Sequence, residues 1–301
     1  MVYHIAFCCP VRNCARYLPY IFRNISLFRA NNNYTISCIF CYDNCHDNTE
    51  SLLLDYQKMY KENTYLITAN NSHSLRTVRI ANARNECIKI LYNDLKNVDY
   101  HIMIDCDDVN IYKWDIAILN KYISNFDNDD WDCITFNRKP YYDMWAVLID
   151  HYKHHCWGFG KLSKKALSLM KQHIKIKLSP HSLKKSNSIY CHSAYNGFAI
   201  YKTPKFKGIL YDGFYSSITK LITDKEREDT FKYFREKHGM NIHAHDGSYV
   251  LDNRKSKGNE ECCCEHIYYH LSAIKQNDCK IKISKFHYHL YDKQNRPLKH
   301  D

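Results

Sequence analysis

The N-terminal third of the chain alternates between short apolar runs and amphipathic stretches. Runs rich in β-branched and aromatic residues predict strands over residues 4–9, 34–42, 64–68 and 100–104, with Pro10 ending the first. Apolar residues at helical spacing predict helices between them: one that Asn13 can cap, one from about Thr49, and one over residues 80–95. This order predicts an α/β fold with a mostly parallel central sheet flanked by helices, Rossmann-like in its N-terminal half.

The alternation of predicted strands and helices is less regular beyond Val109. The predicted helices there cover residues 115–126, 163–173 and 265–276, and the predicted strands cover 131–137, 144–149, 197–202 and 280–284. Neither an internal repeat nor a clear linker interrupts the chain. We therefore expect a single domain over residues 1–278, made of the halves 1–110 and 111–278, followed by a basic C-terminal tail over 279–301.

Composition narrows the class of protein. Hydrophobic residues make up 45% of the chain and charged residues 25%, which supports a sizeable core. No run approaches the roughly 18 apolar residues that span a bilayer, and the first residues lack the pattern of a signal peptide, so we expect a cytoplasmic protein. The abundance of Tyr, Asn, Lys and Ile is typical of an AT-rich genome, such as that of a large DNA virus, for which the host cytoplasm or the virion is the expected location.

Glycine is scarce, and its placement excludes two kinds of nucleotide site. The chain has eight glycines, and the first is Gly158. The N-terminal half therefore holds neither a Walker A loop nor a G-x-G-x-x-G dinucleotide fingerprint. If this half binds a nucleotide, it must do so through carboxylates and a metal ion.

The basic residues are unevenly distributed. The formal net charge is +11, and the segment 151–211 contains twelve Lys but no Arg, Asp or Glu. Such a segment can form a surface for an acidic partner, including peripheral contact with a membrane, or simply a solvated face. We expect no nucleic-acid partner, because the segment lacks the Arg that is favoured for phosphate and base recognition.

Three carboxylates follow the fourth predicted strand directly, in the run Asp105-Cys106-Asp107-Asp108. Ligands bind at the carboxyl ends of strands in open α/β sheets. Because the three carboxylates repel each other, a site there favours a bound cation, and hard oxygen ligands suit Mg²⁺ or Mn²⁺. The alternative is a polar turn with no ligand.

Two further groups carry potential chemistry. Arg84 falls on the apolar stripe of the helix predicted over 80–95, where an unpaired charge is costly, and the Asp cluster is its nearest plausible partner. Glu265 and His266 open a predicted helix, where the dipole favours a carboxylate and a general base can be aimed into a site. We expect this pair to converge on the cleft that holds Asp105 and Asp107. The structural alternatives are a salt bridge and a helix cap.

Taken together, these features resemble a known family. The chain shows, in order, Pro10-Val11-Arg12-Asn13, Asp43, Asp47-Asn48-Thr49, Ala83-Arg84-Asn85 and Asp105-Cys106-Asp107-Asp108. This series resembles the nucleotide-diphospho-sugar transferases of GT-A fold, as in family-2-type glycosyltransferases. The segments 141–146 and 264–266 also resemble the fungal capsule-associated mannosyltransferase group. The resemblance covers residues 1–110 well and the rest in patches.

The resemblance implies a metal-dependent glycosyltransferase (a hexosyltransferase) that moves a sugar from a nucleoside-diphosphate donor to a hydroxyl of a glycan or protein acceptor. Residues 1–110 would then be the nucleotide-sugar half and 111–278 the acceptor half. Pro10, Arg12 and Asp43 are implied in nucleotide binding, with Asp43 on the base. The run Asn44-Cys45-His46 departs from the Gly and Ser that are usual there.

The same resemblance implies roles nearer the reaction. Asp105 and Asp107 match the Asp-x-Asp pair that holds Mn²⁺ or Mg²⁺, and His266 would complete the metal sphere. Arg84 would support the diphosphate or the Asp pair. Glu265 and Asp108 are the expected catalytic residues, with Glu265 as acceptor base if the enzyme inverts configuration.

Three other classes stay open at this level. A carboxylate cluster with Lys-rich and Tyr-rich segments also suits a metal-dependent nuclease or nucleic-acid binder. Cys38 and Cys41 suggest zinc, but their odd separation on a predicted strand places them on opposite faces, where they cannot share one ion. The third alternative is a transferase fold without activity.

Overall fold

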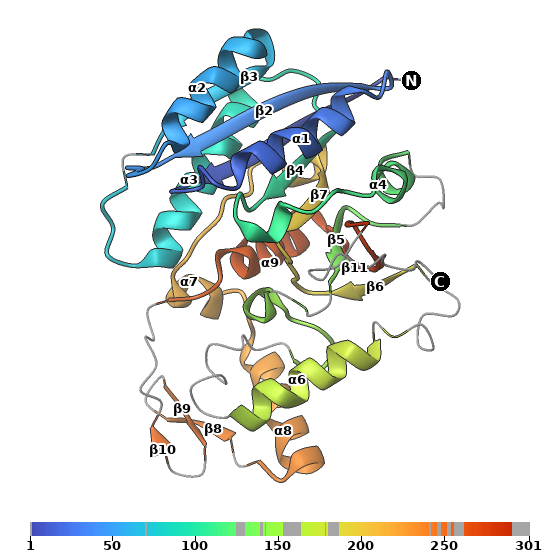
Figure 1. Ribbon diagram of the computed structural model, residues 1–301. Helices are drawn as coiled ribbons and strands as arrows, with labels where there is room; N and C mark the ends of the chain where they lie inside the picture. Colours follow the sequence, from blue (N-terminus) through green and yellow to red (C-terminus); the bar gives the residue numbers. More distant parts are fainter. Residues whose placement is uncertain are drawn as a thin grey trace.

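A single eight-stranded sheet runs through the computed structural model of the chain (Figure 1). Its strands are β1 (Tyr3–Val11), β2 (Tyr34–Tyr42), β3 (Thr64–Thr68), β4 (Tyr100–Ile104), β5 (Cys133–Asn137), β6 (Ser188–Cys191), β7 (Phe198–Lys202) and β11 (Ile281–His287). Their order across the sheet is β3-β2-β1-β4-β7-β5-β11-β6. Only β7 and β6 run against the others, so the mostly parallel α/β sheet expected from the sequence is confirmed.

The structure describes residues 2–69, 71–124, 130–138, 141, 143–152, 164–177, 179, 187–240, 242–245, 248–251, 254–255 and 262–290. The α-helices are α1 (Leu18–Arg29), α2 (Thr49–Met59), α3 (Arg76–Asn93), α4 (Ile116–Ile123), α6 (Lys164–Lys177), α7 (Tyr215–Thr219), α8 (Asp224–His238) and α9 (Glu265–Asn277). The 3-10 helices are η1 (Lys61–Asn63), η2 (Asp108–Asn110), η3 (Met144–Ala146) and η4 (Thr203–Phe206). A small antiparallel sheet of β8 (Ile242–His245), β9 (Ser248–Leu251) and β10 (Arg254–Lys255) lies with α6 and α8 at the far end of the molecule (Figure 1).

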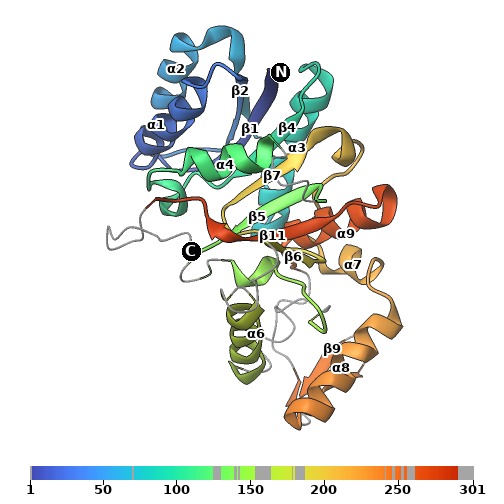
Figure 2. The same ribbon diagram turned by 90° about the vertical axis from the view of Figure 1, so that its right-hand side faces the viewer.

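Helices cover both faces of the central sheet (Figure 2). On one face α1, α2 and α4 enclose a core that includes Ile5 and Phe7 of β1. On the other face α3 and α9 pack over Ala6 and Cys8. Because neighbouring residues of β1 enter two different cores, this strand must be apolar almost throughout. The same alternation places Cys38 and Cys41 of β2 in opposite cores, as the sequence predicts.

Two local expectations about the first half are corrected by longer-range contacts. The first strand continues through Pro10, which pairs in register with Cys41. This position tolerates proline because β4 pairs with β1 only over residues 5–8. Asn13 does not cap α1, which begins at Leu18. Asn13 instead takes a φ of 52° in the loop after β1. Its side-chain oxygen accepts from the His46 N–H at 2.8 Å, which links this loop to the loop after β2.

The predicted strand over 144–149 is wrong. The Asp143 side chain accepts a hydrogen bond from the Trp145 N–H at 3.0 Å and caps η3. Such local side-chain hydrogen bonds compete with extended structure. After η3 the chain forms isolated bridges, such as the one between Leu148 and Ser193, rather than a strand.

The strand predicted over 280–284 is confirmed, and it shows that the basic tail predicted from residue 279 begins too early. Residues 281–287 form β11, which lies between β5 and β6 inside the central sheet. Ile281 and Ile283 are almost fully buried, while the Lys282 ammonium lies 4.3 Å from the centre of the Tyr190 ring. A lysine stem can cover apolar surface while its charge stays at an aromatic ring, so basic residues do not prevent strand formation here.

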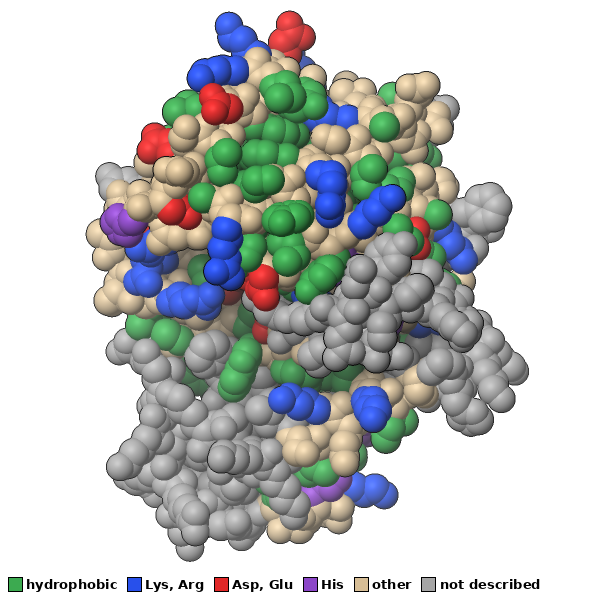
Figure 3. Space-filling view, viewed as in Figure 1, with side chains coloured by type: hydrophobic (Ala, Val, Ile, Leu, Met, Phe, Trp, Pro, Cys, Tyr) green, Lys and Arg blue, Asp and Glu red, His purple; other side chains and the backbone are tan. Residues whose placement is uncertain are grey.

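No helix within the described ranges combines the length and apolar character needed to cross a membrane. On the visible face of the described surface, Lys and Arg side chains are scattered among apolar and acidic ones (Figure 3). Much of the Lys-rich segment, including 153–163 and 180–186, lies outside the described residues. Within α6, His173 and Lys177 pair with Asp150 at 2.7 and 3.0 Å, so part of this positive charge serves internal contacts.

Candidate active site

A cavity of about 600 Å³ opens at the carboxyl ends of β1, β2 and β4. This volume is within the usual range for small-molecule sites, and this edge of an α/β sheet is where ligands bind. The N-terminal parts of α3 and α9 and the 3-10 helix η3 close it. Its charged lining residues are Arg12, Asp43, Arg76, Arg79, Arg84, Asp105, Asp107, Asp143 and Glu265.

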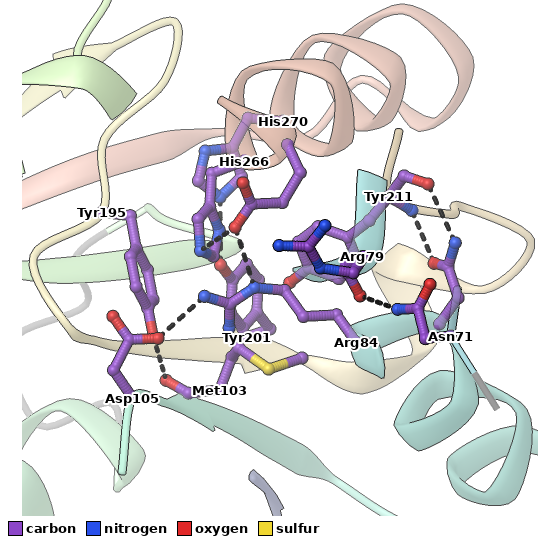
Figure 4. A network of polar contacts seen from close by, with 12 residues as sticks. Asn71, Arg79, Arg84, Met103, Asp105, Tyr195, Tyr201, Tyr211, His266 and His270 are labelled. Atoms are coloured by element: carbon purple, nitrogen blue, oxygen red, sulfur yellow. Dashed lines mark hydrogen bonds and ion pairs between the residues drawn. The ribbon is translucent and has the colours of Figure 1, made fainter. Parts of the chain in front are cut away.

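Arg84 joins two carboxylates that are distant in sequence. Its Nη2 donates to Asp105 Oδ1 at 2.8 Å, and its Nε donates to Glu265 Oε1 at 3.0 Å (Figure 4). The Arg84 side chain is 4% exposed, and the side chains of Asp105 and Glu265 are 22% and 8% exposed. The partner that the sequence predicts for Arg84 is therefore present, and a second one comes from α9.

Aromatic rings surround the Arg84 guanidinium. Its central carbon lies 5.1 Å from the centre of the Tyr195 ring and 5.8 Å from that of Tyr211. Burial alone would lower the pKa of Arg84, but Tyr195 and the two carboxylates raise it well above its ordinary value. The group is a permanent buried cation, and its Nη1 makes no hydrogen bond within the described structure.

The Asp cluster divides into two residues on the cavity and one away from it. Asp105 and Asp107 line the cavity, whereas Asp108 is exposed, begins η2 and does not line it. Asp107 Oδ1 caps η2 by accepting from the Val109 N–H at 3.0 Å. Asp108 is therefore set apart from the cavity-lining pair, and its expected catalytic role stays a prediction.

The residues expected to bind the nucleotide also line this cavity. Pro10 and Arg12 lie at the end of β1, and Asp43 follows β2. Arg12 Nη1 lies 3.9 Å from Asp43 Oδ2, and Asp43 Oδ1 is buried without a hydrogen-bond partner in the described structure. Asn44 takes a φ of 30°, so an asparagine provides the left-handed conformation here without glycine.

His266 lies behind the cavity wall instead of on it. Its ring stacks on Tyr195 with the ring centres 3.6 Å apart, and its Nε2 lies 3.7 Å from Glu265 Oε1 (Figure 4). Burial, followed by the charge of Arg84, holds the pKa of His266 well below its usual range, so the ring is neutral. The ring therefore packs against Tyr195 and does not line the cavity, and metal ligation by His266 stays a prediction.

Asp105 and Asp107 are the cavity-lining carboxylates that follow β4, where the sequence predicts a cation site. The described residues contain no group of three or more His, Cys, Asp or Glu arranged to hold a metal ion. Mg²⁺ is commonly bound by one or two carboxylates, with substrate phosphates and water supplying the remaining ligands. Two cavity-lining carboxylates that follow β4 fit that mode of binding, and they do not fit a closed structural zinc site.

Asp143 is the cavity residue that was missing from the expected site. It lies at the start of η3, is partly buried and lines the cavity beside Trp145. Burial, and then the negative charges of Glu265 and Asp105, raise the pKa of Asp143 to about 7. The signal available in the sequence was the 141–146 segment of the family resemblance, but the strand predicted from residue 144 gave no reason to place Asp143 in the cavity.

Several solved glycosyltransferase structures resemble this one at low similarity. S. aureus TarS 1-349 aligns at 13% identity with a TM-score of 0.38, covering 77% of this chain and 55% of that one. The mannosyltransferase PcManGT from Pyrobaculum calidifontis, in complex with GDP-Man and Mn²⁺, aligns at 7% identity with a TM-score of 0.38, covering 70% of this chain and 48% of that one.

Glucosyl-3-phosphoglycerate synthase from Mycobacterium tuberculosis, in complex with Mg²⁺ and uridine-diphosphate, aligns at 10% identity with a TM-score of 0.37, covering 79% of this chain and 66% of that one. This chain thus spans about half the length of TarS 1-349. No protein-family model and no curated protein matches the sequence. Similarity at this level transfers no residue role to this chain.

Proposed function

We propose that this protein is a metal-dependent glycosyltransferase that moves a sugar from a nucleoside-diphosphate donor to a hydroxyl acceptor. The observation that carries the proposal is the contact of Arg84 with both Asp105 and Glu265 on one cavity wall. The Ala-Arg-Asn and Asp-x-Asp motifs of the N-terminal half thereby meet the start of α9 at the edge of the sheet where ligands bind. A cytoplasmic location and a viral or other AT-rich source remain expectations from the sequence.

The cavity offers distinct surfaces to the parts of a donor. Asp43 lines the cavity, and its carboxylate can accept a hydrogen bond from a nucleotide base. Arg76 and Arg79, on the first turn of α3, bring positive charge to the wall that a diphosphate would face. Asp105 and Asp107 would hold Mn²⁺ or Mg²⁺, which stabilises the negative charge that develops on the leaving diphosphate.

We assign the acceptor side to the part of the cavity formed by η3 and the start of α9. Glu265, at the start of α9, and Asp143 and Trp145, from η3, line it there. The acceptor must enter on this side and exclude water from the donor, because water competes for the same reactive carbon. A hydroxyl group is a weak nucleophile, so a carboxylate on this side has to receive its proton.

A thermal-shift screen tests the proposal. UDP-glucose, UDP-N-acetylglucosamine, GDP-mannose and the corresponding nucleoside diphosphates are each added with Mn²⁺, with Mg²⁺ and with chelator. We expect one nucleotide class to raise the unfolding temperature only with a divalent ion, because a ligand that binds the folded state stabilises it.

The expected companion result is slow, metal-dependent release of nucleoside diphosphate from the stabilising donor. If no nucleotide stabilises the protein and supercoiled DNA is nicked in Mg²⁺, the site belongs to a nuclease and the proposal is refuted. Zinc retained through dialysis, without any response to nucleotides, would refute it in favour of a zinc protein.

A further inference from the structure

The cavity holds three carboxyl groups in different electrostatic settings near its acceptor side. Asp105 and Glu265 are each held by Arg84, at 2.8 and 3.0 Å. The Asp143 carboxylate instead accepts hydrogen bonds from backbone N–H groups, including that of Trp145 at 3.0 Å. No ion pair joins Asp143 to a cation in the part of the chain that the structure describes.

A carboxylate bound to a guanidinium is a poor proton acceptor, since the cation favours its charged form. The Oε1 of Glu265, which the sequence suggested as the base, already accepts from Arg84 Nε at 3.0 Å. Burial, and then the negative charges of Glu265 and Asp105, instead raise the pKa of Asp143 and so disfavour its charged form. Cys264 and Tyr141, which also interact with it, add no positive charge.

We infer that Asp143, and not Glu265, receives the proton of the acceptor hydroxyl, an assignment that rests on the proposed glycosyltransferase function. The Asp143 carboxylate takes the proton while the acceptor oxygen forms a bond to the anomeric carbon of the donor sugar. The bond from that carbon to the diphosphate oxygen breaks, and its electron pair leaves with the nucleoside diphosphate. A single displacement of this kind inverts the configuration at the anomeric carbon.

The same environment tunes Asp143 for this task near neutral pH. Burial and the neighbouring carboxylates raise its pKa to about 7, and a base is most effective when its pKa lies near the working pH. Only the ionised form can accept a proton. Turnover should therefore fall as the pH is lowered through the pKa of Asp143.

The test compares Asp143→Asn with the matched variant Glu265→Gln, using whichever of UDP-glucose, UDP-N-acetylglucosamine or GDP-mannose stabilises the wild type with Mn²⁺. Asn keeps a side-chain oxygen that can accept from the Trp145 N–H, so η3 should stay capped and the unfolding temperature should confirm folding. We expect release of nucleoside diphosphate, with water as acceptor, to fall about 10²–10⁴-fold in Asp143→Asn. Donor affinity should change less than about twofold, since this residue contacts the acceptor side.

Two readouts separate loss of a base from a merely structural effect. Azide, a nucleophile that carries no proton to remove, should raise donor consumption by Asp143→Asn at least about tenfold and give an inverted glycosyl azide. The pH dependence should persist in Glu265→Gln but move to lower pH, because this variant loses one of the two carboxylates whose charges raise the pKa of Asp143. Its other expected defect is a weaker hold on Arg84, since a neutral amide replaces the charged partner of Arg84 Nε.

The outcomes distinguish the two proposals. If the wild type neither binds nor consumes any of these donors, the glycosyltransferase function fails, and the assignment of Asp143 fails with it. If the wild type consumes donor but Asp143→Asn keeps a comparable rate, only the assignment of Asp143 is overturned. Loss of the pH dependence in Glu265→Gln, with Asp143→Asn unchanged, would identify Glu265 as the base.

Discussion

Replacing Arg84 by Met tests whether this guanidinium holds the two parts of the site together. The substitution keeps an unbranched side chain of similar length and removes a cation that is 96% buried, since its side chain is 4% exposed. Glu265 and Asp105 would then face each other with no compensating charge. Breaking a buried ion pair by removing one partner costs about 3–5 kcal/mol, and the 22% exposure of Asp105 places this case at about 3 kcal/mol.

The assay is chemical denaturation followed by tryptophan fluorescence at pH 5, 7 and 8. The free energy of unfolding of Arg84→Met should be about 3 kcal/mol below wild type at pH 7. The deficit should shrink toward pH 5, because the two orphaned carboxylates can then bind protons in the folded variant. Adding Glu265→Gln should restore part of the loss, with a coupling energy of about 1–3 kcal/mol. A loss below about 1 kcal/mol, or a deficit that grows as the pH falls, would refute the view that Arg84 neutralises a buried pair.

Three further substitutions test separate parts of the structure. Asp107→Asn should fold normally, because its remaining side-chain oxygen can still cap η2, and it should lose Mn²⁺-dependent stabilisation by donor in a thermal-shift assay. A donor response like that of wild type would show that Asp105 and Asp107 form only a turn. His266→Phe keeps a ring stacked on Tyr195 and removes two buried nitrogens that lack hydrogen bonds, so denaturation should show unchanged stability or a gain of about 1 kcal/mol. A loss of the Mn²⁺ response in this variant would contradict the position described for His266. Gly213→Ala should lower the free energy of unfolding by about 1–3 kcal/mol in the same measurement, because its new Cβ would lie 2.4 Å from the backbone carbon of Thr77. An unchanged free energy of unfolding would contradict the packing of this loop against α3.

Local pattern was enough to predict the first half of the fold. The bounds predicted for β2, β3 and β4 agree with the structure, and the helices between the strands lie where helical spacing places them. Each of these elements is encoded by its own run of residues: apolar for buried strands and periodic for helices. The same logic placed Asp105 and Asp107 at the end of a strand, where α/β sheets bind ligands.

The Arg84 prediction succeeded for a similar reason. A charge on an apolar stripe requires a partner, and in this topology Asp105 lies one strand away. The second partner was harder to foresee, because Glu265 is separated from Arg84 by 181 residues. The sequence indicated only that a carboxylate at a helix N-terminus can be aimed into a site.

What the sequence determined by itself is therefore the set of elements that short-range pattern encodes, together with the carboxylates fixed to their ends. Tertiary structure decided the rest: the insertion of β11 into the sheet, the burial of His266 against Tyr195 and the entry of Asp143 into the cavity. Each of these outcomes depends on which distant surfaces pack together. A residue's neighbours along the chain do not carry that information, because burial and charge at a site are set by contacts formed only when the whole sheet is assembled.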